Sequence, residues 1–303
     1  MTNKKVIGID LGTGFSAVAT IENGNAIIIA NKEGNRTTPS VVQISDDGSD
    51  IKIGGAAKRS MVTKPKNTVQ FVKRLMGANY DDHDVQEMIK RSTYNIINKN
   101  NKPYVKIGDR DYSPEQISSM IVNEMKKTAE DYLGTEVKDA VITCPAWFND
   151  VQRQATKMAG ELAGLNVLRI INEPTAAILA SSLTTDKKDK KVAVVDVGCG
   201  TTDISVCDIS DGVVEVLASD GDVFLGGVNY DNALADYIIS EFKKENNVDL
   251  AKDKLAYPRI IEASEKAKCE LSTSTQTDIN LPYISVTESG PLNLIMTITR
   301  AKF

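Results

Sequence analysis

The sequence predicts an α/β protein of two lobes, each of which opens with a β-hairpin turned by glycine. An apolar, β-branched run that ends in Asp-x-Gly-x-Gly occurs at residues 6–14 and again at residues 192–200. The length of 303 residues exceeds what a single hydrophobic core usually serves, which favours two lobes. Strand and helix patterns alternate between residues 137 and 171, as expected for a parallel strand pair joined by a right-handed crossover.

Each repeated hairpin has the chemistry of a phosphate site. Glycine in the turn lets backbone N–H groups approach an anion closely. The aspartate that ends each first strand, Asp10 or Asp196, can hold a divalent cation, usually through water when the metal is Mg²⁺. One Asp-x-Gly-x-Gly alone is a weak signal and more often marks a plain turn. Because the motif is duplicated, we expect two facing hairpins that grip a nucleoside triphosphate.

The remaining elements follow from hydrophobic periodicity and from helix-end signals. In order, the first half predicts a strand at 41–44, a polar and mixed stretch at 51–101 that is typical of a small inserted subdomain, a helix at 115–133 capped by Gly134, a strand at 137–143, a helix at 149–164, a strand at 167–171, and a helix that starts at Glu173 with Pro174 in its first turn. The second half predicts the repeated hairpin at 192–209, a strand at 213–219, helices at 230–246 and 260–271, and antiparallel strands at 277–284 and 292–299.

Composition and charge exclude several classes of protein. The chain is 41% hydrophobic and 25% charged with a net charge of −5, so neither nucleic acid nor an anionic membrane is expected as its main partner. No signal-peptide core, spanning segment or paired cysteine spacing is present, which predicts a cytoplasmic protein. His83 is the only histidine and lies in a polar run, 81–84, that predicts a surface loop. A catalytic Ser-His or Cys-His pair is therefore excluded unless His83 serves it, and so is a histidine-rich metal site.

Several segments resemble a known family along the full length of the chain. They are residues 7–13 (IGIDLGT), 35–40 (NRTTPS), 67–77 (NTVQFVKRLMG), 140–155 (AVITCPAWFNDVQRQA), 169–177 (RIINEPTAA), 196–203, 221–231, 265–272, 276–283 (QTDINLPY) and 299–302. The sequence resembles the N-terminal ATPase domain of the heat-shock protein 70 family, the DnaK-type molecular chaperones. The segment RIINEPTAA is nearly diagnostic, whereas actins and sugar kinases share only the hairpins.

The resemblance implies an α/β fold of the actin-like ATPase type, with ribonuclease H-like duplicated lobes, inserted subdomains and an incomplete second lobe. Lobe I would span 1–186, with a core subdomain at 1–38 and 113–186 and an inserted subdomain at 39–112. Lobe II would span 187–303, with a partial core subdomain at 187–225 and an inserted subdomain at 226–303. The chain stops before the family's Gly-Gly-Ser/Gln-Thr-Arg adenosine motif. That ending predicts weak nucleotide affinity, little turnover by this chain alone and exposed apolar surface near residue 303.

The resemblance also assigns roles to residues of the two hairpins and their surroundings. Asp10 and Asp196 would hold Mg²⁺, with K⁺ nearby. Lys73 would neutralise charge that develops on the transferred phosphoryl group, and Glu173 and Asp203 would orient the attacking water. By residue type alone, Lys73 would be a surface lysine on a helix, and only the match of residues 67–77 to the family overturns this. Glu173 could equally be a capping acid at a helix start. The phosphates would be cradled by Gly12, Thr13, Gly14, Gly198, Cys199, Gly200 and Thr201.

Further roles fall in the second lobe and at partner surfaces. Gly226 and Gly227 would approach the phosphates, while Glu265, Lys268 and Ser272 share a helix face and would line the adenosine pocket. Pro145 and Arg153 correspond to the family's relay between nucleotide state and substrate domain, and Arg169 and Asn172 to positions that meet the J-domain co-chaperone. A nucleotide exchange factor is a further implied partner, and client peptides would bind a C-terminal domain outside this chain.

The hairpin turns depart from the family at specific positions. Gly14 and Phe15 replace what is commonly a hydroxyl or amide pair, Cys199 replaces a glycine and Thr202 a phenylalanine, and Val228 replaces a common acidic residue. A thiol beside phosphate offers an oxidation site, although a tolerated small residue is the plainer interpretation. The sequence thus favours an ATP-hydrolysing chaperone domain. A small-molecule phosphotransferase and a nucleotide-binding fragment without hydrolysis remain the alternatives.

Overall fold

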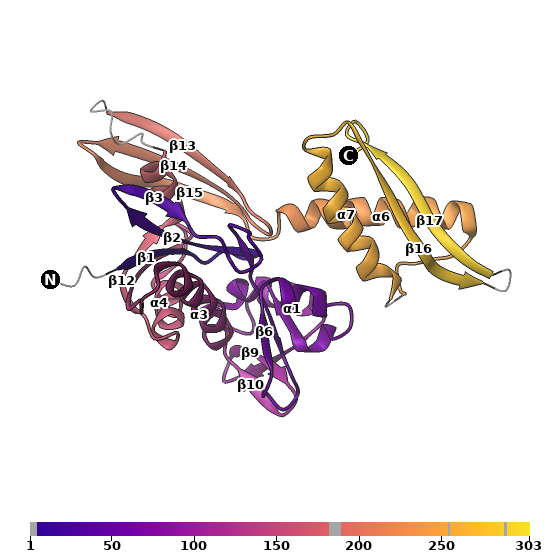
Figure 1. The fold of residues 1–303 in the computed structure, drawn as a ribbon, viewed down its shortest axis with the longest axis horizontal. Coiled ribbons are helices and arrows are strands. Elements are labelled where there is room, and N and C mark those ends of the chain that lie inside the picture. The colour runs from indigo at the N-terminus through magenta and orange to yellow at the C-terminus, as the bar shows by residue number, and fades with distance from the viewer. Residues whose placement is uncertain (1–4, 182–188, 254, 288–289) are drawn as a thin grey trace. The chain divides into compact units, whose positions relative to one another are not determined.

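The computed structural model describes residues 5–181, 189–253, 255–287 and 290–303 (Figure 1). The chain forms two compact units, Met1–Val223 and Phe224–Phe303. The predicted boundary between the lobes, at residues 186 and 187, lies outside the described residues. That boundary and the predicted subdomain limits therefore stay predictions.

A mixed sheet forms the centre of the first unit, with strands in the order β12-β11-β1-β2-β3 and β4 paired to β2. Its parallel pairs are β1 with β11 and β11 with β12, whereas β2 runs antiparallel to β1 and to β3. The strands are β1 (Val6–Asp10), β2 (Phe15–Glu22), β3 (Asn25–Ile28), β4 (Thr38–Pro39), β11 (Asp139–Cys144) and β12 (Asn166–Asn172). The first predicted hairpin and the parallel crossover are both confirmed.

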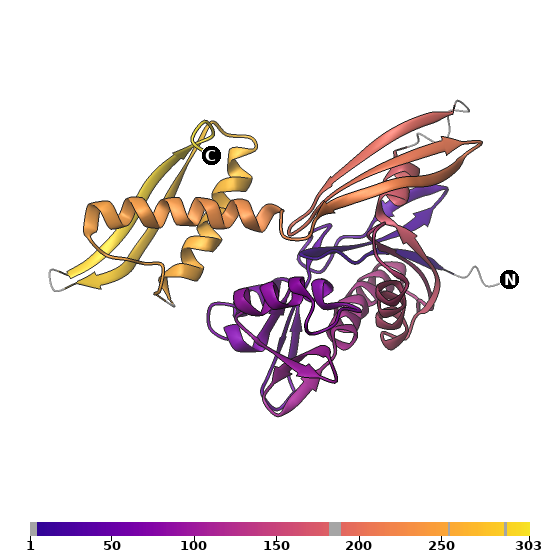
Figure 2. The same ribbon diagram turned by 180° about the vertical axis from the view of Figure 1, so that it is seen from behind.

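Three helices of the first unit contact its central sheet. They are α3 (Pro114–Leu133), α4 (Asp150–Leu162) and α5 (Glu173–Ala180). Helix α3 ends at the left-handed Gly134, as predicted, and it starts at a capping box of Ser113 and Gln116 that the sequence analysis did not identify. Helix α4 also starts at a capping box, formed by Asn149 and Gln152. Helices α3 and α4 pack side by side (Figure 2), and both contact the central sheet, so their apolar faces are buried together.

The stretch between β4 and α3 folds around two small sheets and several short helices. One sheet has the order β6-β5-β7 and the other β10-β9-β8. The elements are β5 (Val41–Ile44), β6 (Ile51–Ile53), α1 (Gly55–Ser60), η1 (Pro65–Asn67), β7 (Thr68–Gln70), η2 (Val72–Leu75), α2 (His83–Arg91), β8 (Asn95–Lys99), β9 (Lys102–Ile107) and β10 (Arg110–Tyr112). The predicted loop at 81–84 is wrong in its second half, because His83 begins α2. Val85 and Met88 lie one turn apart on that helix and are buried, which fixes the polar segment as a helix.

The repeated motif forms a three-stranded antiparallel sheet in the order β13-β14-β15. The strands are β13 (Lys190–Val197), β14 (Thr202–Ser210) and β15 (Val213–Asp222), which confirms the second hairpin and the strand after it. The register of β13 and β14 places Asp196 opposite Asp203. Helix α5 contacts β12, β13 and β15, so it connects this sheet to the central one.

The second unit is a pair of helices packed on a two-stranded antiparallel sheet (Figure 1). Its elements are α6 (Gly227–Asn246), α7 (Ala256–Leu271), β16 (Gln276–Thr287) and β17 (Gly290–Thr299). All four were predicted, although α6 begins at Gly227 rather than at residue 230. Its core includes Ile238, Phe242 and Ile260. Within the described parts of the chain, no helix is long and apolar enough to cross a bilayer.

The packing of the central sheet predicts the effect of a buried truncation. Ile142 on β11 is fully buried, whereas Ile21 on β2 of the same sheet is 61% exposed. Because Ile142→Ala leaves a cavity, we expect it to lower the free energy of unfolding by about 2–5 kcal/mol. Ile21→Ala should change it by less than about 1 kcal/mol. Urea unfolding of both variants measures this, and equal losses would contradict the assigned packing.

Candidate functional site

The turn of the first hairpin is held from outside by Ser40. Its hydroxyl donates to the Gly12 carbonyl at 2.8 Å and its backbone N–H donates to the Gly14 carbonyl at 2.8 Å. The same hydroxyl lies 2.9 Å from that of Ser16. A Cβ on Gly12 would lie 2.0 Å from the carbonyl oxygen of Phe15, so the turn requires glycine at this position.

The turn of the second hairpin lies against the first. The Gly198 N–H donates to the Thr201 carbonyl at 2.8 Å, which closes this turn. A Cβ on Gly14 would lie 2.3 Å from Sγ of Cys199, and one on Gly200 would lie 3.5 Å from the Thr13 methyl group. The structure therefore brings the glycines predicted to cradle phosphate into one place. Phe15, beside them, is partly exposed.

A buried ion pair lies beside these turns. Nζ of Lys73 donates to Oε1 of Glu173 at 2.7 Å, and Lys73 is only 8% exposed, so it is not a surface lysine. Burial lowers the pKa of Lys73, but the charge and hydrogen bond of Glu173 outweigh it and leave that pKa raised. Burial also raises the pKa of Glu173, helped by the charges of Asp10 and Asp196 and opposed by Lys73.

Three aspartates complete this cluster. Asp10 accepts a hydrogen bond from the Thr143 hydroxyl at 2.9 Å, and Asp203 accepts one from the Trp147 indole at 2.7 Å. Partial burial and the charges of Asp203 and Asp10 raise the pKa of Asp196. These mutual effects place Asp10, Asp196, Asp203 and Glu173 within one electrostatic site. A site with four carboxylates and one ammonium group favours the binding of cations.

The oxygen donors of this cluster fit Mg²⁺. Mg²⁺ is a hard cation that keeps several waters and is commonly held by one or two carboxylates together with substrate phosphates. Across the described residues, no group of three or more His, Cys, Asp and Glu side chains is placed to hold a metal ion, so the protein would supply at most two of its ligands. A bound cation would offset the charges of Asp203 and Asp10, which raise the pKa of Asp196. Asp10 and Asp196 remain the predicted holders.

The family model described as Hsp70 protein matches residues 6–303. The chain belongs to the Hsp70 family. The mixed sheet and the repeated hairpin fit the actin-like ATPase fold of Hsp70 proteins, so the predicted fold class is confirmed. Membership supports a chaperone nucleotide-binding domain, and Hsp70 proteins in general are ATPases that bind ATP and ADP.

The second unit of this Hsp70 chain holds the other predicted nucleotide residues. Nζ of Lys268 lies 2.7 Å from Oδ1 of Asp231 and donates to the Gly227 carbonyl at 3.0 Å. Two predicted residues, Lys268 and Gly227, are thus brought together at the start of α6. Glu265 lies on α7 with Lys268, and Ser272 is the residue that caps α7. Gly226 donates its N–H to the Asn229 side chain at 3.0 Å and serves as the N-cap of α6.

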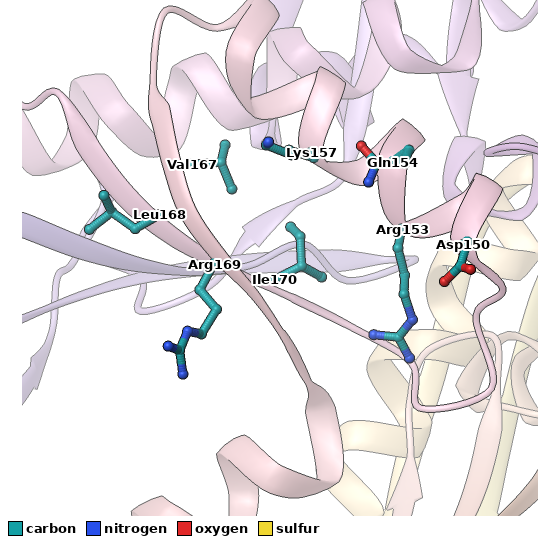
Figure 3. A pocket seen from close by; sticks show the side chains of 8 residues that line it. All are labelled: Asp150, Arg153, Gln154, Lys157, Val167, Leu168, Arg169 and Ile170. Carbon is teal, nitrogen blue, oxygen red and sulfur yellow. The ribbon is translucent and has the colours of Figure 1, made fainter.

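A cavity of about 300 Å³ lies between α4 and β12 in the first unit (Figure 3). It contains two residues that the Hsp70 resemblance singled out, Arg169 and Arg153. The Arg153 guanidinium donates to the carbonyls of Phe148 and Ala146, each at 2.9 Å, and so holds the turn that follows Pro145. The full lining is Asp150, Arg153, Gln154, Lys157, Val167, Leu168, Arg169 and Ile170. Asn172 lies just beyond, as the N-cap residue of α5.

Four residues that support the site were not identified from the sequence. Trp147 and Thr143 hold the carboxylates, and Ser40 holds the first turn. Arg74 donates to the Gly200 carbonyl at 2.6 Å and so contacts the second turn. All four lie in or beside segments that carry the family resemblance, but residue type alone gave no reason to select them. Their contacts become visible only in the folded chain, which brings together segments that are far apart in sequence.

The contact between the two turns predicts a paired mutational effect. Gly14→Ala places a Cβ 2.3 Å from Sγ of Cys199, so we expect a lower melting temperature and weaker MgADP binding. Cys199→Gly removes the clash, and the double variant should recover most of both losses. Gly8→Ala on β1 is the control, because its Cβ would meet nothing within 4 Å. A double variant as impaired as Gly14→Ala would contradict this contact.

The buried ion pair predicts a pH-dependent loss of stability. Lys73→Met leaves the Glu173 carboxylate buried without its cation, at a cost of about 3 kcal/mol at neutral pH. The pKa of Glu173, already raised, then rises further. In this variant, Glu173 binds its proton more tightly in the folded chain than in the unfolded chain, where its pKa is about 4.3. The free energy of unfolding is therefore fully retained below about pH 4.3 and falls as pH rises through the folded-state pKa of Glu173.

Chemical denaturation of the Lys73→Met variant between pH 5 and 8 measures this effect. Its deficit relative to the wild type should grow as pH rises. The variant that combines Lys73→Met with Glu173→Gln should lose the extra pH dependence, since no buried carboxyl remains to titrate. If the deficit of Lys73→Met is as independent of pH as that of the double variant, an unpaired Glu173 is excluded as its cause.

Proposed function

We propose that this chain is the ATP-binding and ATP-hydrolysing domain of an Hsp70-type chaperone, which couples turnover to peptide binding in a separate substrate domain. The observation that carries the proposal is the Lys73–Glu173 pair, 2.7 Å long and buried, beside the carboxylates of the two hairpins. Water-mediated phosphoryl transfer relies on positioning and electrostatics, and a lysine with several carboxylates supplies both. The family match supports the nucleotide specificity.

The hairpin turns would bind the phosphates. Their backbone N–H groups can approach an anion because glycine leaves the turns without side chains. Thr13 and Thr201 would add hydroxyl groups, with Thr201 beside the reacting phosphoryl. Asp10 and Asp196 would hold Mg²⁺, which when bound offsets the charge of the phosphates. K⁺ would bind in the same acidic surroundings.

The reacting groups would be Lys73, Glu173 and Asp203. The Lys73 ammonium is a fixed positive charge and would stabilise negative charge that develops on the transferred phosphoryl. The carboxylates of Glu173 and Asp203 would accept hydrogen bonds from the attacking water and orient it. Burial makes these contacts stronger than they would be in water. The Lys73–Glu173 contact holds both side chains in place before the substrate arrives.

Residues of the second unit would complete nucleotide binding, and other proteins would bind the first unit. Glu265, Lys268 and Ser272 would contact the adenosine, and Gly226 and Gly227 the phosphates. A J-domain co-chaperone would meet Arg169 and Asn172. A nucleotide exchange factor and unfolded client peptides would be the other partners, the peptides through a further domain. We propose the cytoplasm as the location of this activity.

Calorimetric titration with MgATP and MgADP, followed by single-turnover hydrolysis, tests this function. We expect weak binding of both nucleotides and slow hydrolysis by this chain, and EDTA should abolish both. Lys73→Ala should lower the rate of hydrolysis about 10²–10³-fold, since it removes a preorganised charge. Lys90→Ala, which removes an exposed lysine that pairs with Glu87, is the matched control.

Other outcomes of these measurements would favour the alternatives. Nucleotide binding without hydrolysis would indicate a regulatory binding domain. Release of ADP only when a sugar or another small acceptor is present would indicate a phosphotransferase. Failure to bind either nucleotide would overturn the proposal.

A further inference from the structure

Trp147 is the only tryptophan of the chain, and its indole reaches the site. Its Nε1–H donates to Oδ1 of Asp203 at 2.7 Å, over a sequence separation of 56 residues. Such a short contact from a neutral donor to a carboxylate is a charge-assisted hydrogen bond, which is stronger than a bond between two neutral groups. It connects the segment after β11 to the start of β14.

Beyond this hydrogen bond, the Trp147 ring has a second contact. It packs edge-on against Phe148, with 5.0 Å between the ring centroids and an interplanar angle of 78°. Phe148 is itself buried, and its ring lies 5.9 Å from Nζ of Lys73. The Arg153 guanidinium donates to the carbonyls on both sides of Trp147, those of Ala146 and Phe148. The indole is thus fixed by its backbone and by its ring.

We propose that Trp147 is a positioning residue for hydrolysis, acting through Asp203. This role rests on the proposed ATPase function. The indole N–H occupies Oδ1 and fixes the rotation of the carboxylate. Oδ2 is then the oxygen that accepts a hydrogen bond from the attacking water. A freely rotating Asp203 would present either oxygen and would hold the water less often in the productive direction.

The chemistry of indole suits this task. Its N–H can donate but cannot accept, so it never competes with Asp203 for a proton of the water. A phenol at the same position could both donate and accept.

Kinetics of two variants separate this role from simple packing. Trp147→Phe keeps a ring against Phe148 but removes the donor, and should lower kcat about tenfold with KM for ATP unchanged. Trp147→Tyr offers a hydroxyl donor and should recover part of kcat. Equal kcat in the wild type and Trp147→Phe would overturn the positioning role. So would a loss in Trp147→Phe that appears only in KM.

The indole N–H gives a second readout that needs no nucleotide. In selectively ¹⁵N-Trp-labelled protein, one indole resonance is expected, and its proton should be shifted downfield by the charged acceptor. Asp203→Asn should move it upfield, whereas Asp208→Asn should not. Asp208 is the matched control on the same strand, where it pairs with Lys191 at 3.4 Å.

The two readouts fail in different ways. An indole resonance that ignores Asp203→Asn would overturn the hydrogen bond and the positioning role with it, whatever the ATPase rate. A wild-type chain without hydrolysis would instead overturn the proposed function, and with it any role of Trp147 in turnover. A shifted indole resonance in that chain would leave only a structural bond.

Discussion

The site depends on a single buried ion pair, Lys73 with Glu173, whose partners are 100 residues apart in sequence. An ammonium or a carboxylate that leaves water pays a large desolvation cost, and only a close partner offsets it. The short helix η2 must therefore stay against the first turn of α5. Because α5 also contacts β13 and β15, the pair fixes the inserted segment against both sheets that carry the hairpins.

The surplus of carboxylates around that pair raises the pKa values of neighbouring acidic groups. Glu173 and Asp196 both have raised pKa values, and in each case burial and neighbouring carboxylates are the cause. A protein does not gain stability by gathering such groups, so the arrangement favours a ligand that brings positive charge. Under the proposed function, a metal ion chelated by the phosphates would supply that charge and would carry the substrate with it.

Much of this fold follows from local signals in the sequence. Helix α3 has an apolar stripe, a capping box and a C-terminal glycine, and these agree on its limits. The hairpins follow from β-branched runs around glycine. The start of α2 was missed because its first turn is polar, and only the burial of Val85 and Met88 against distant residues stabilises it. The glycines and carboxylates of the site were likewise predictable from the repeat and the family resemblance. The bond between Trp147 and Asp203 was not, because it joins two segments that only the tertiary fold places together.

The contact between Gly14 and Cys199 constrains the order in which this chain could have changed. A thiol side chain at position 199 fits only where position 14 has no Cβ, since the two would lie 2.3 Å apart. A history that introduced Cys199 first would have passed through a strained intermediate, whereas one that first reduced residue 14 to glycine would not. The two positions are therefore expected to vary together among close relatives. A transplant of either hairpin alone into a related protein would carry half of a matched pair.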